Sequence, residues 1–188
     1  GPSHAEEVAR GVPCAVAIAS RDHSIAVQIQ DLFSHDTFRV YTLEDVVGVE
    51  LGGAVKNVIA IAAGVLDGLG LGLNTRAALI TRGQTEIRRL GIKMGASPRT
   101  FTSLAGIGDL ILTCTGTLSR NHTVGMKIGQ GQQLESILAQ MHMVAEGVRT
   151  AKSVYNLSRK LDVEMPICHA IYRVLYEELP PKKALIEL

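Results

Sequence analysis

The spacing of apolar residues changes near residue 46, and this change limits the folds open to the chain. Before it, residues 13–20 (PCAVAIAS) and 38–42 (FRVYT) are short runs of strand-forming residues, and residues 24–33 repeat apolar positions at helical spacing. After Gly53, every regular pattern is helical. We therefore predict a strand, a helix and a strand followed by an all-α region, with residues 46–51 as a candidate for one more strand.

The helical patterns after Gly53 are separated by Gly, Pro and polar residues. The clearest helix covers residues 166–177, where Pro166 suits the first helical position and apolar residues recur along one stripe. The other predicted helices cover residues 54–66, 75–94, 98–105, 123–128, 133–140, 147–160 and 182–188.

These elements predict a mainly α chain with two domains. A strand–helix–strand unit of about 45 residues is too small to stand alone as a doubly wound sheet, which needs several such units. We therefore expect residues 1–50 to be the C-terminal remnant of an α/β domain. Residues 51–188 are expected to form an all-α domain.

Composition disfavours several classes of function. The chain of 188 residues carries 19 Lys and Arg against 18 Asp and Glu, and only 4% of its residues are aromatic. A nearly neutral chain with so few stacking rings is a poor candidate for nucleic-acid binding. Cys14, Cys114 and Cys168 are far apart and form no CxxC pair, which indicates neither a disulfide framework nor a zinc site. A reducing cytoplasm is the expected location.

No membrane span is predicted, and the chain has an unusual start. The longest purely apolar run, residues 58–66, is about half of the roughly 20 residues that a spanning helix needs. The chain begins GPSHAEE, without Met and without the apolar core of a signal peptide. We expect a further segment upstream of Gly1.

Lys56 is the first candidate for chemistry. In a helix from Ala54, the apolar residues form one face, while Lys56, Ala60, Ala63 and Asp67 share another. With so little bulk beside Lys56, a ligand or a second backbone could approach closely, which suits a proton donor or acceptor. The alternative is a lysine whose stem covers a tightly packed helix and whose ammonium reaches solvent.

Two glycine-rich segments resemble phosphate-binding loops only superficially. Residues 68–72 (GLGLG) and 129–131 (GQG) lack the GxGxxG spacing and follow helices instead of strands. We interpret both as turns that end helices.

Asp109 and the run Ser119-Arg120-Asn121 are further candidates. Asp109 lies between the glycines of GIGD and an apolar run, where it could cap a helix or pair with a nearby cation. A hydroxyl, a guanidinium and an amide in sequence suit a phosphate dianion, although surface loops often have such a composition.

The histidines and Cys114 are weaker candidates. His4, His23, His35, His122, His142 and His169 show no spacing typical of metal ligands, so we interpret them as surface or core residues and predict no metal site. Cys114 has no paired base in the sequence, so a nucleophilic role is disfavoured.

Taken together, four segments resemble the cytoplasmic NAD(P)-dependent glycerol-3-phosphate dehydrogenase family. They occur in the family's order and spacing along essentially the whole chain. The segments are GPSHAEEVARG, GVELGGAVKNVIAIAAGVLDGLGLGLNTRAALITRG, LAGIGDLILTCTGTLSRN and VAEGVRTAKSVYNLS.

The resemblance implies a fold and a reaction. The fold would be the last βαβ part of a Rossmann-like dinucleotide-binding domain, followed by a helical substrate domain like the C-terminal domain of 6-phosphogluconate dehydrogenase. The reaction would be reversible reduction of dihydroxyacetone phosphate to sn-glycerol 3-phosphate, for glycerophospholipid biosynthesis. The implied cofactor is NAD or NADP, and the implied assembly is a cytoplasmic homodimer.

Carried over position by position, the resemblance also implies roles for single residues. Lys56 would transfer the proton at the substrate oxygen, and Asp109 would be its charge partner and a substrate contact. Asn57 completes the matching Lys-Asn pair. The other implied substrate contacts are Gly1, Ser3, Ser119, Arg120 and Asn121, and the positions implied to approach the cofactor are Ala5, Arg120, Val144 and Glu146.

One departure from the family matters. Its glycine-rich cofactor fingerprint and a further substrate-contacting lysine should precede Gly1, so we expect this chain to be a fragment that binds NAD(P)H poorly and turns over little by itself. The preference between NAD and NADP depends on that upstream region. The rival hypotheses are another β-hydroxyacid or 6-phosphogluconate dehydrogenase-like enzyme, and a non-catalytic helical module that dimerises.

Overall fold

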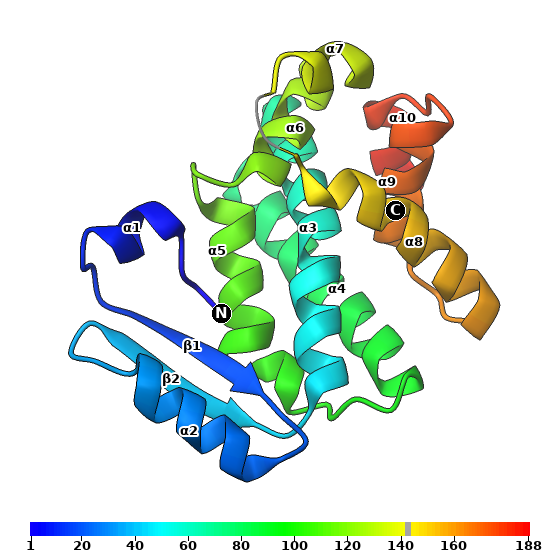
Figure 1. Cartoon of the computed structure of the whole chain (residues 1–188). Helices are drawn as coiled ribbons and strands as arrows, with labels where there is room; N and C mark the ends of the chain where they lie inside the picture. The colour runs from blue at the N-terminus through cyan, green and yellow to red at the C-terminus, as the bar shows by residue number, and fades with distance from the viewer. Residues whose placement is uncertain (142–143) are drawn as a thin grey trace.

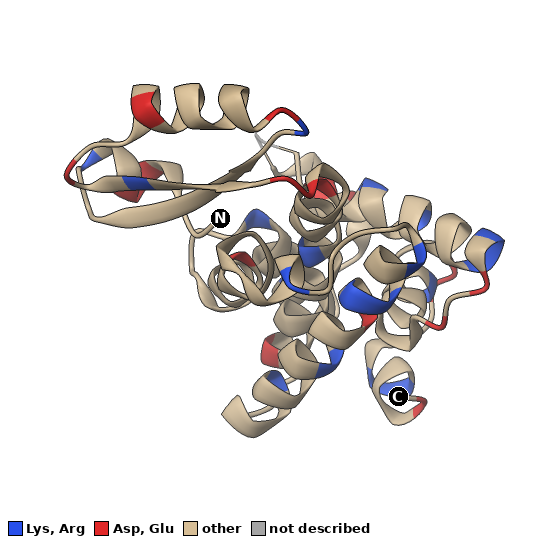
Figure 2. Ribbon diagram, turned by 90° about the horizontal axis from the view of Figure 1, so that it is seen from below, with Lys and Arg blue, Asp and Glu red and all other residues tan. Residues whose placement is uncertain are grey.

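The computed structural model describes residues 1–141 and 144–188, which form a small sheet layer set against a helical bundle (Figure 1). The N-terminal elements are α1 (Ala5–Ala9), β1 (Cys14–Ala19), α2 (His23–Phe33) and β2 (Phe38–Leu43). The two strands pair in parallel, with Cys14 opposite Phe38 and Ala19 opposite Leu43. The predicted strand–helix–strand unit is confirmed, and it lies to one side of the bundle (Figure 2).

The predicted strand at residues 46–51 is wrong, because helix α3 (Val46–Gly68) already begins there. Asp45 caps this helix by accepting the N–H of Gly48 at 2.9 Å. Its other carboxylate oxygen accepts hydrogen bonds from Ser97 N–H at 2.8 Å and the Thr100 hydroxyl at 2.6 Å. Burial acts to raise the pKa of Asp45, but these hydrogen bonds outweigh it and hold the pKa below its usual value.

The remaining elements form the bundle around α3. Residues 98–105, predicted as one helix, hold only the short turn η1 (Thr100–Thr102) and the start of a π-helical turn, η2 (Leu104–Gly108). The sequence patterns predict neither α1 nor helix α5 (Asp109–Thr115). The predicted boundary between residues 50 and 51 falls within α3 and stays a prediction. The bundle consists of α4 (Leu73–Lys93), η1 (Thr100–Thr102), η2 (Leu104–Gly108), α5 (Asp109–Thr115), α6 (Arg120–Gly129), α7 (Leu134–Ala139), α8 (Glu146–Leu161), α9 (Pro166–Tyr176) and α10 (Pro181–Ile186).

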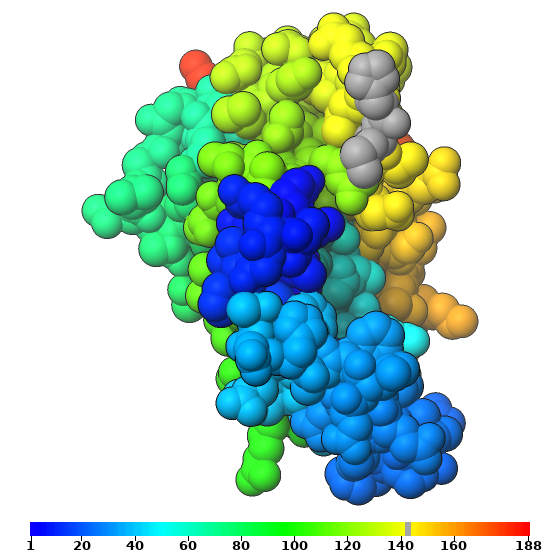
Figure 3. Space-filling view, turned by 60° about the vertical axis from the view of Figure 1, so that its left-hand side comes forward, coloured from blue at the N-terminus to red at the C-terminus, as the bar shows by residue number. Residues whose placement is uncertain are grey.

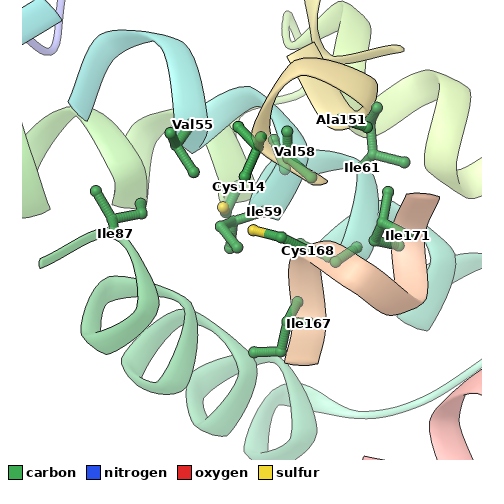
Figure 4. Close-up of a cluster of buried hydrophobic side chains, with 14 of the residues drawn as sticks. Val55, Val58, Ile59, Ile61, Ile87, Cys114, Ala151, Ile167, Cys168 and Ile171 are labelled. Carbon is green, nitrogen blue, oxygen red and sulfur yellow. The ribbon is translucent and has the colours of Figure 1, made fainter. Parts of the chain in front are cut away.

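Helix α3 is the core of the bundle and contacts α4, α5, α6, α8 and α9. Val55, Val58, Ile59 and Ile61 of α3 are completely buried among side chains from these helices (Figure 4). By length and composition alone, α3 could cross a membrane. Its enclosure by other helices accounts for the same apolar sequence.

Helices α3 and α6 pack backbone against backbone through four glycines. A Cβ at Gly64 or Gly68 of α3 would overlap carbonyl oxygens of α6, and a Cβ at Gly125 or Gly129 of α6 would overlap carbonyl oxygens of α3. The glycines are spaced four residues apart in each helix, so they line one face of each. This contact holds α6 beside the C-terminal part of α3.

We predict that Gly125→Ala destabilises the fold by at least about 2 kcal/mol, because the added methyl overlaps the Ile61 carbonyl and forces two packed helices apart. Gly53→Ala is the matched control, since a Cβ there meets no atom within 4 Å. The control should gain about 0.5–1 kcal/mol from the lower backbone entropy of alanine. Urea unfolding measures both changes, and equal stabilities for the two variants would contradict the packing argument.

A buried carboxylate joins α4 to α9. Glu86 is only 3% exposed, and it accepts the N–H groups of Ile167 at 2.7 Å and Cys168 at 3.1 Å. These donors lie in the first turn of α9, where no helical carbonyl is available to them. Burial raises the pKa of Glu86, although the two hydrogen bonds oppose the shift.

We predict that Glu86→Ala lowers the free energy of unfolding by about 1–3 kcal/mol, because both N–H groups lose their acceptor in a buried place. Glu86→Gln, which keeps one acceptor oxygen, should lose less. Since burial raises the pKa of Glu86 above the ordinary glutamate value of 4.5, its contribution to stability is largest below pH 4.5 and falls as pH rises through the folded pKa. Unfolding of wild type and Glu86→Gln across this range tests the sign, and a wild-type advantage that grows with pH would contradict it.

Candidate functional site

Lys56 of α3 and Asp109 of α5 form an ion pair at the edge of the bundle. The Lys56 Nζ atom lies 2.5 Å from Asp109 Oδ1, and the two side chains are 19% and 8% exposed. A carboxylate in this position attracts the ammonium strongly, because little water screens the pair. Lys56 therefore keeps a fixed partner, in contrast to a lysine whose ammonium extends freely into solvent.

Asp109 also joins the bundle to the N-terminal segment. Its Oδ2 atom lies 3.1 Å from the nitrogen of Gly1, and its backbone oxygen accepts the Thr113 hydroxyl at 2.6 Å. Gly108 occupies the N-cap position of α5, and no side chain caps this helix. The interpretation of Asp109 as a simple cap is therefore wrong. The carboxylate faces two nitrogen atoms from distant parts of the chain.

The segment Gly1–Ser3 lies between the sheet and α5. A Cβ at Gly1 would approach the Cα of Val16 in β1 to 2.8 Å, so the backbone passes the strand closely. The Ser3 hydroxyl donates to the Gly1 carbonyl at 3.2 Å, and Ala5 starts α1. Figure 3 shows these first residues in dark blue against the green helices.

Ser119, Arg120 and Asn121 lie at the start of α6, but they face different surroundings. The Ser119 hydroxyl caps the helix by accepting the His122 N–H at 3.3 Å. Arg120 is exposed and donates from Nη1 to the Val144 carbonyl at 3.2 Å. Its guanidinium therefore lies close to the start of α8.

Asn121 bridges three helices. Its Nδ2 donates to Asn57 Oδ1 at 3.0 Å, and its Oδ1 accepts the Gly147 N–H at 2.8 Å. Asn57 in turn donates to the Gly53 carbonyl at 3.3 Å. In the part of the chain that the structure describes, the Asn121 amide donates to one acceptor only, and a second N–H can donate to a ligand. This chain of amides places α6 and α8 beside the turn of α3 that carries Lys56.

The predicted site residues thus form two groups. The groups meet at α3, because Lys56 belongs to one group and its neighbour Asn57 belongs to the other. One group surrounds the Lys56–Asp109 pair and includes Gly1, with Ser3 bonded to it. The other contains Asn57, Arg120, Asn121, Val144 and the neighbouring Glu146. Within the described residues, neither Ser119 nor Arg120 forms a hydrogen bond or an ion pair with Lys56.

The structure adds contacts that sequence patterns did not indicate. His122 and Arg76 both bind Asp67, with His122 Nε2 at 2.7 Å from Oδ2 and Arg76 Nη2 at 2.5 Å from Oδ1. These three residues come from different helices, so no local pattern could have joined them. The closest signal in the sequence was that Asp67 shares one face of the predicted helix with Lys56.

The other histidines and the cysteines offer little chemistry. His169 contacts the buried Ser158 hydroxyl at 2.7 Å, and His142 lies outside the described residues. In residues 1–141 and 144–188, no three His, Cys, Asp or Glu side chains are grouped as a metal site. Burial raises the pKa of the Cys114 thiol to about 12, against a smaller opposing effect of Lys56, so the reactive thiolate is disfavoured.

The arrangement supports acid–base chemistry on an anionic ligand. A partly exposed ammonium, fixed by a carboxylate, can stabilise negative charge on an oxygen and give it a proton. The exposed Arg120 guanidinium, at the N-terminus of a ten-residue helix, is suited to bind a phosphate.

Known proteins resemble the chain closely. A family model described as the C-terminus of NAD-dependent glycerol-3-phosphate dehydrogenase matches residues 45–186. Glycerol-3-phosphate dehydrogenases [NAD(P)+] of Geobacter sulfurreducens and Geobacter metallireducens are 61% and 62% identical over all 188 residues. The crystal structure of glycerol-3-phosphate dehydrogenase from Coxiella burnetii is 43% identical, with a TM-score of 0.97 over 100% of this chain and 57% of that one.

The chain spans 56% of the length of the two Geobacter relatives. The family match covers α3 to α10 completely, and the Coxiella structure superimposes on the sheet layer as well as on the bundle. The chain therefore belongs to the NAD-dependent glycerol-3-phosphate dehydrogenase family and corresponds to the C-terminal part of its members.

Proposed function

We propose that this chain is the substrate-binding part of an enzyme that reversibly reduces dihydroxyacetone phosphate to sn-glycerol 3-phosphate with NADH or NADPH. The observation that carries the proposal is the Lys56–Asp109 ion pair, an ammonium held by a carboxylate at 2.5 Å. The names of the Geobacter relatives supply the reaction. The product would serve glycerophospholipid synthesis in the cytoplasm.

Lys56 would act on the oxygen of the reacting carbon. Negative charge builds on that oxygen during reduction of a ketone, and an ammonium beside it stabilises the charge and supplies the proton. Asp109 would hold the ammonium in position, and together with Gly1 and Ser3 it would contact the substrate. In the reverse direction, Lys56 would accept the proton of the alcohol.

Arg120 would bind the phosphate, with Ser119 and Asn121 beside it. A guanidinium can donate two parallel hydrogen bonds to phosphate oxygens, while the Ser119 hydroxyl and the remaining Asn121 N–H supply further donors. A phosphate bound away from the reacting carbon orients that carbon with binding energy that does not depend on the reaction itself.

The four residues implied to approach the cofactor suit one wall of a dinucleotide site. Arg120, Val144 and Glu146 lie together where α6 and α8 begin, and Ala5 begins α1. The exposed guanidinium of Arg120 suits the charged phosphates of a dinucleotide, and the exposed side chain of Val144 suits its aromatic rings. The cofactor would supply the hydride.

We propose that residues 1–50 are the C-terminal part of a dinucleotide-binding domain and that residues 51–188 form the substrate domain of a homodimer.

We predict that Lys56→Ala in the full-length protein lowers kcat for dihydroxyacetone phosphate by about 10²–10⁴-fold, because no group replaces the ammonium. Lys160→Ala, which removes an exposed lysine near the end of α8, is the matched control and should keep the wild-type rate. Oxidation of NAD(P)H is the measurement, with circular dichroism as the check of folding. A folded Lys56→Ala variant with full activity would refute the assignment.

We predict that Arg120→Ala raises KM for dihydroxyacetone phosphate by about 10- to 100-fold, the usual effect of losing hydrogen bonds to a charged group. Activity on dihydroxyacetone, which lacks the phosphate, should change much less. Steady-state kinetics with both substrates separates phosphate binding from a general defect. Equal losses with both substrates would show that Arg120 does not recognise the phosphate.

A further inference from the structure

The backbones of α3 and the π-turn η2 approach each other one helical turn before the Lys56–Asp109 pair. A Cβ added to Gly52 of α3 would lie 3.1 Å from the carbonyl oxygen of Ala105, closer than nine in ten real Cβ contacts. Lys56 follows Gly52 by four residues, and Asp109 follows Ala105 by four residues. The backbone contact and the ion pair are therefore successive contacts between the same two parts of the chain.

The π-turn packs tightly against Phe101 through Gly106. A Cβ at Gly106 would overlap the backbone of Phe101, and Phe101 is completely buried with its ring against Gly91 of α4. Ser103 fixes the start of the turn, because its hydroxyl accepts the Ala105 N–H at 3.2 Å. A methyl group pushed against Ala105 would therefore move α3 and η2 relative to each other.

We propose that Gly52 is a positioning residue, whose missing side chain sets the spacing at which Asp109 reaches Lys56. The proposal rests on the proposed function of Lys56 and adds a residue that contacts neither substrate nor cofactor. An alanine at position 52 shifts the neighbouring backbone by a few tenths of an ångström. The ion pair has a short contact of 2.5 Å and comes from the next turn of each element, so this shift lengthens or reorients it.

The test uses Gly52→Ala in the full-length enzyme. We expect kcat for dihydroxyacetone phosphate to fall about 3- to 10-fold, since a displacement of about 1 Å can cost roughly 100-fold. KM for NAD(P)H should stay within about twofold of wild type. Gly72→Ala is the control, because Gly72 precedes α4 and a Cβ there meets no atom within 4 Å.

A double-mutant cycle shows whether Gly52 acts through the ion pair. In an Asp109→Asn background, Gly52→Ala should lower kcat by less than about twofold, because the contact that it displaces is already weakened. The same 3- to 10-fold loss in both backgrounds would overturn the proposal, as would an unchanged kcat of Gly52→Ala in the wild-type background.

Two further variants keep the outcomes distinct. If Lys56→Ala loses activity while Gly52→Ala does not, the positioning role is wrong and the function of Lys56 stands; if Lys56→Ala is fully active, both are wrong.

Should Gly52→Ala fail to fold, Ser103→Ala loosens the same turn without adding bulk. Ser103→Ala should then lower kcat about 2- to 5-fold in the wild-type background and less than about twofold with Asp109→Asn, and additive losses would overturn the proposal.

Discussion

The direct backbone contact between α3 and α6 is the constraint on which the rest of the structure depends. Glycines at positions 64, 68, 125 and 129 leave no room for a side chain between these helices. The first turn of α6 consequently lies beside α3, where Asn121 reaches both Asn57 and the start of α8. A bundle with ordinary helix spacing would separate the amide chain from Lys56, and the proposed phosphate site would lie farther from the proposed proton donor.

A second close approach, between Gly52 and Ala105, lies nearer the N-terminus of the same helix. The two contacts together place groups from α3, α5, α6 and α8 around one turn of a buried helix. Small residues therefore have two functions in this chain: they remove bulk beside Lys56, and they set the distances between the elements that carry its partners. The glycines of residues 68–72 and 129–131 serve helix ends and packing.

Much of the fold could be predicted from local patterns, because the strands are short runs of strand-forming residues and α2 and most long helices repeat apolar residues at helical spacing. The errors occur where distant residues decide the outcome. The run after Asp45 suits a strand by composition, but hydrogen bonds from Gly48, Ser97 and Thr100 to Asp45 stabilise a helix start. Helix α5 follows a π-turn that depends on Phe101, which no local pattern shows. Lys56 and Asp109 were identifiable as candidates, whereas their 2.5 Å contact needs the fold.

A crystal structure of the full-length protein with NAD(P)+ and sn-glycerol 3-phosphate would show whether Lys56 lies at the reacting oxygen. We predict that Lys56 Nζ lies within about 3.2 Å of the oxygen on the reacting carbon, a hydrogen-bond distance, while it retains its contact with Asp109. We also predict that the phosphate lies against Arg120. A bound substrate whose reacting oxygen lies away from Lys56, or whose phosphate lies away from α6, would contradict the proposed roles of Lys56 and Arg120.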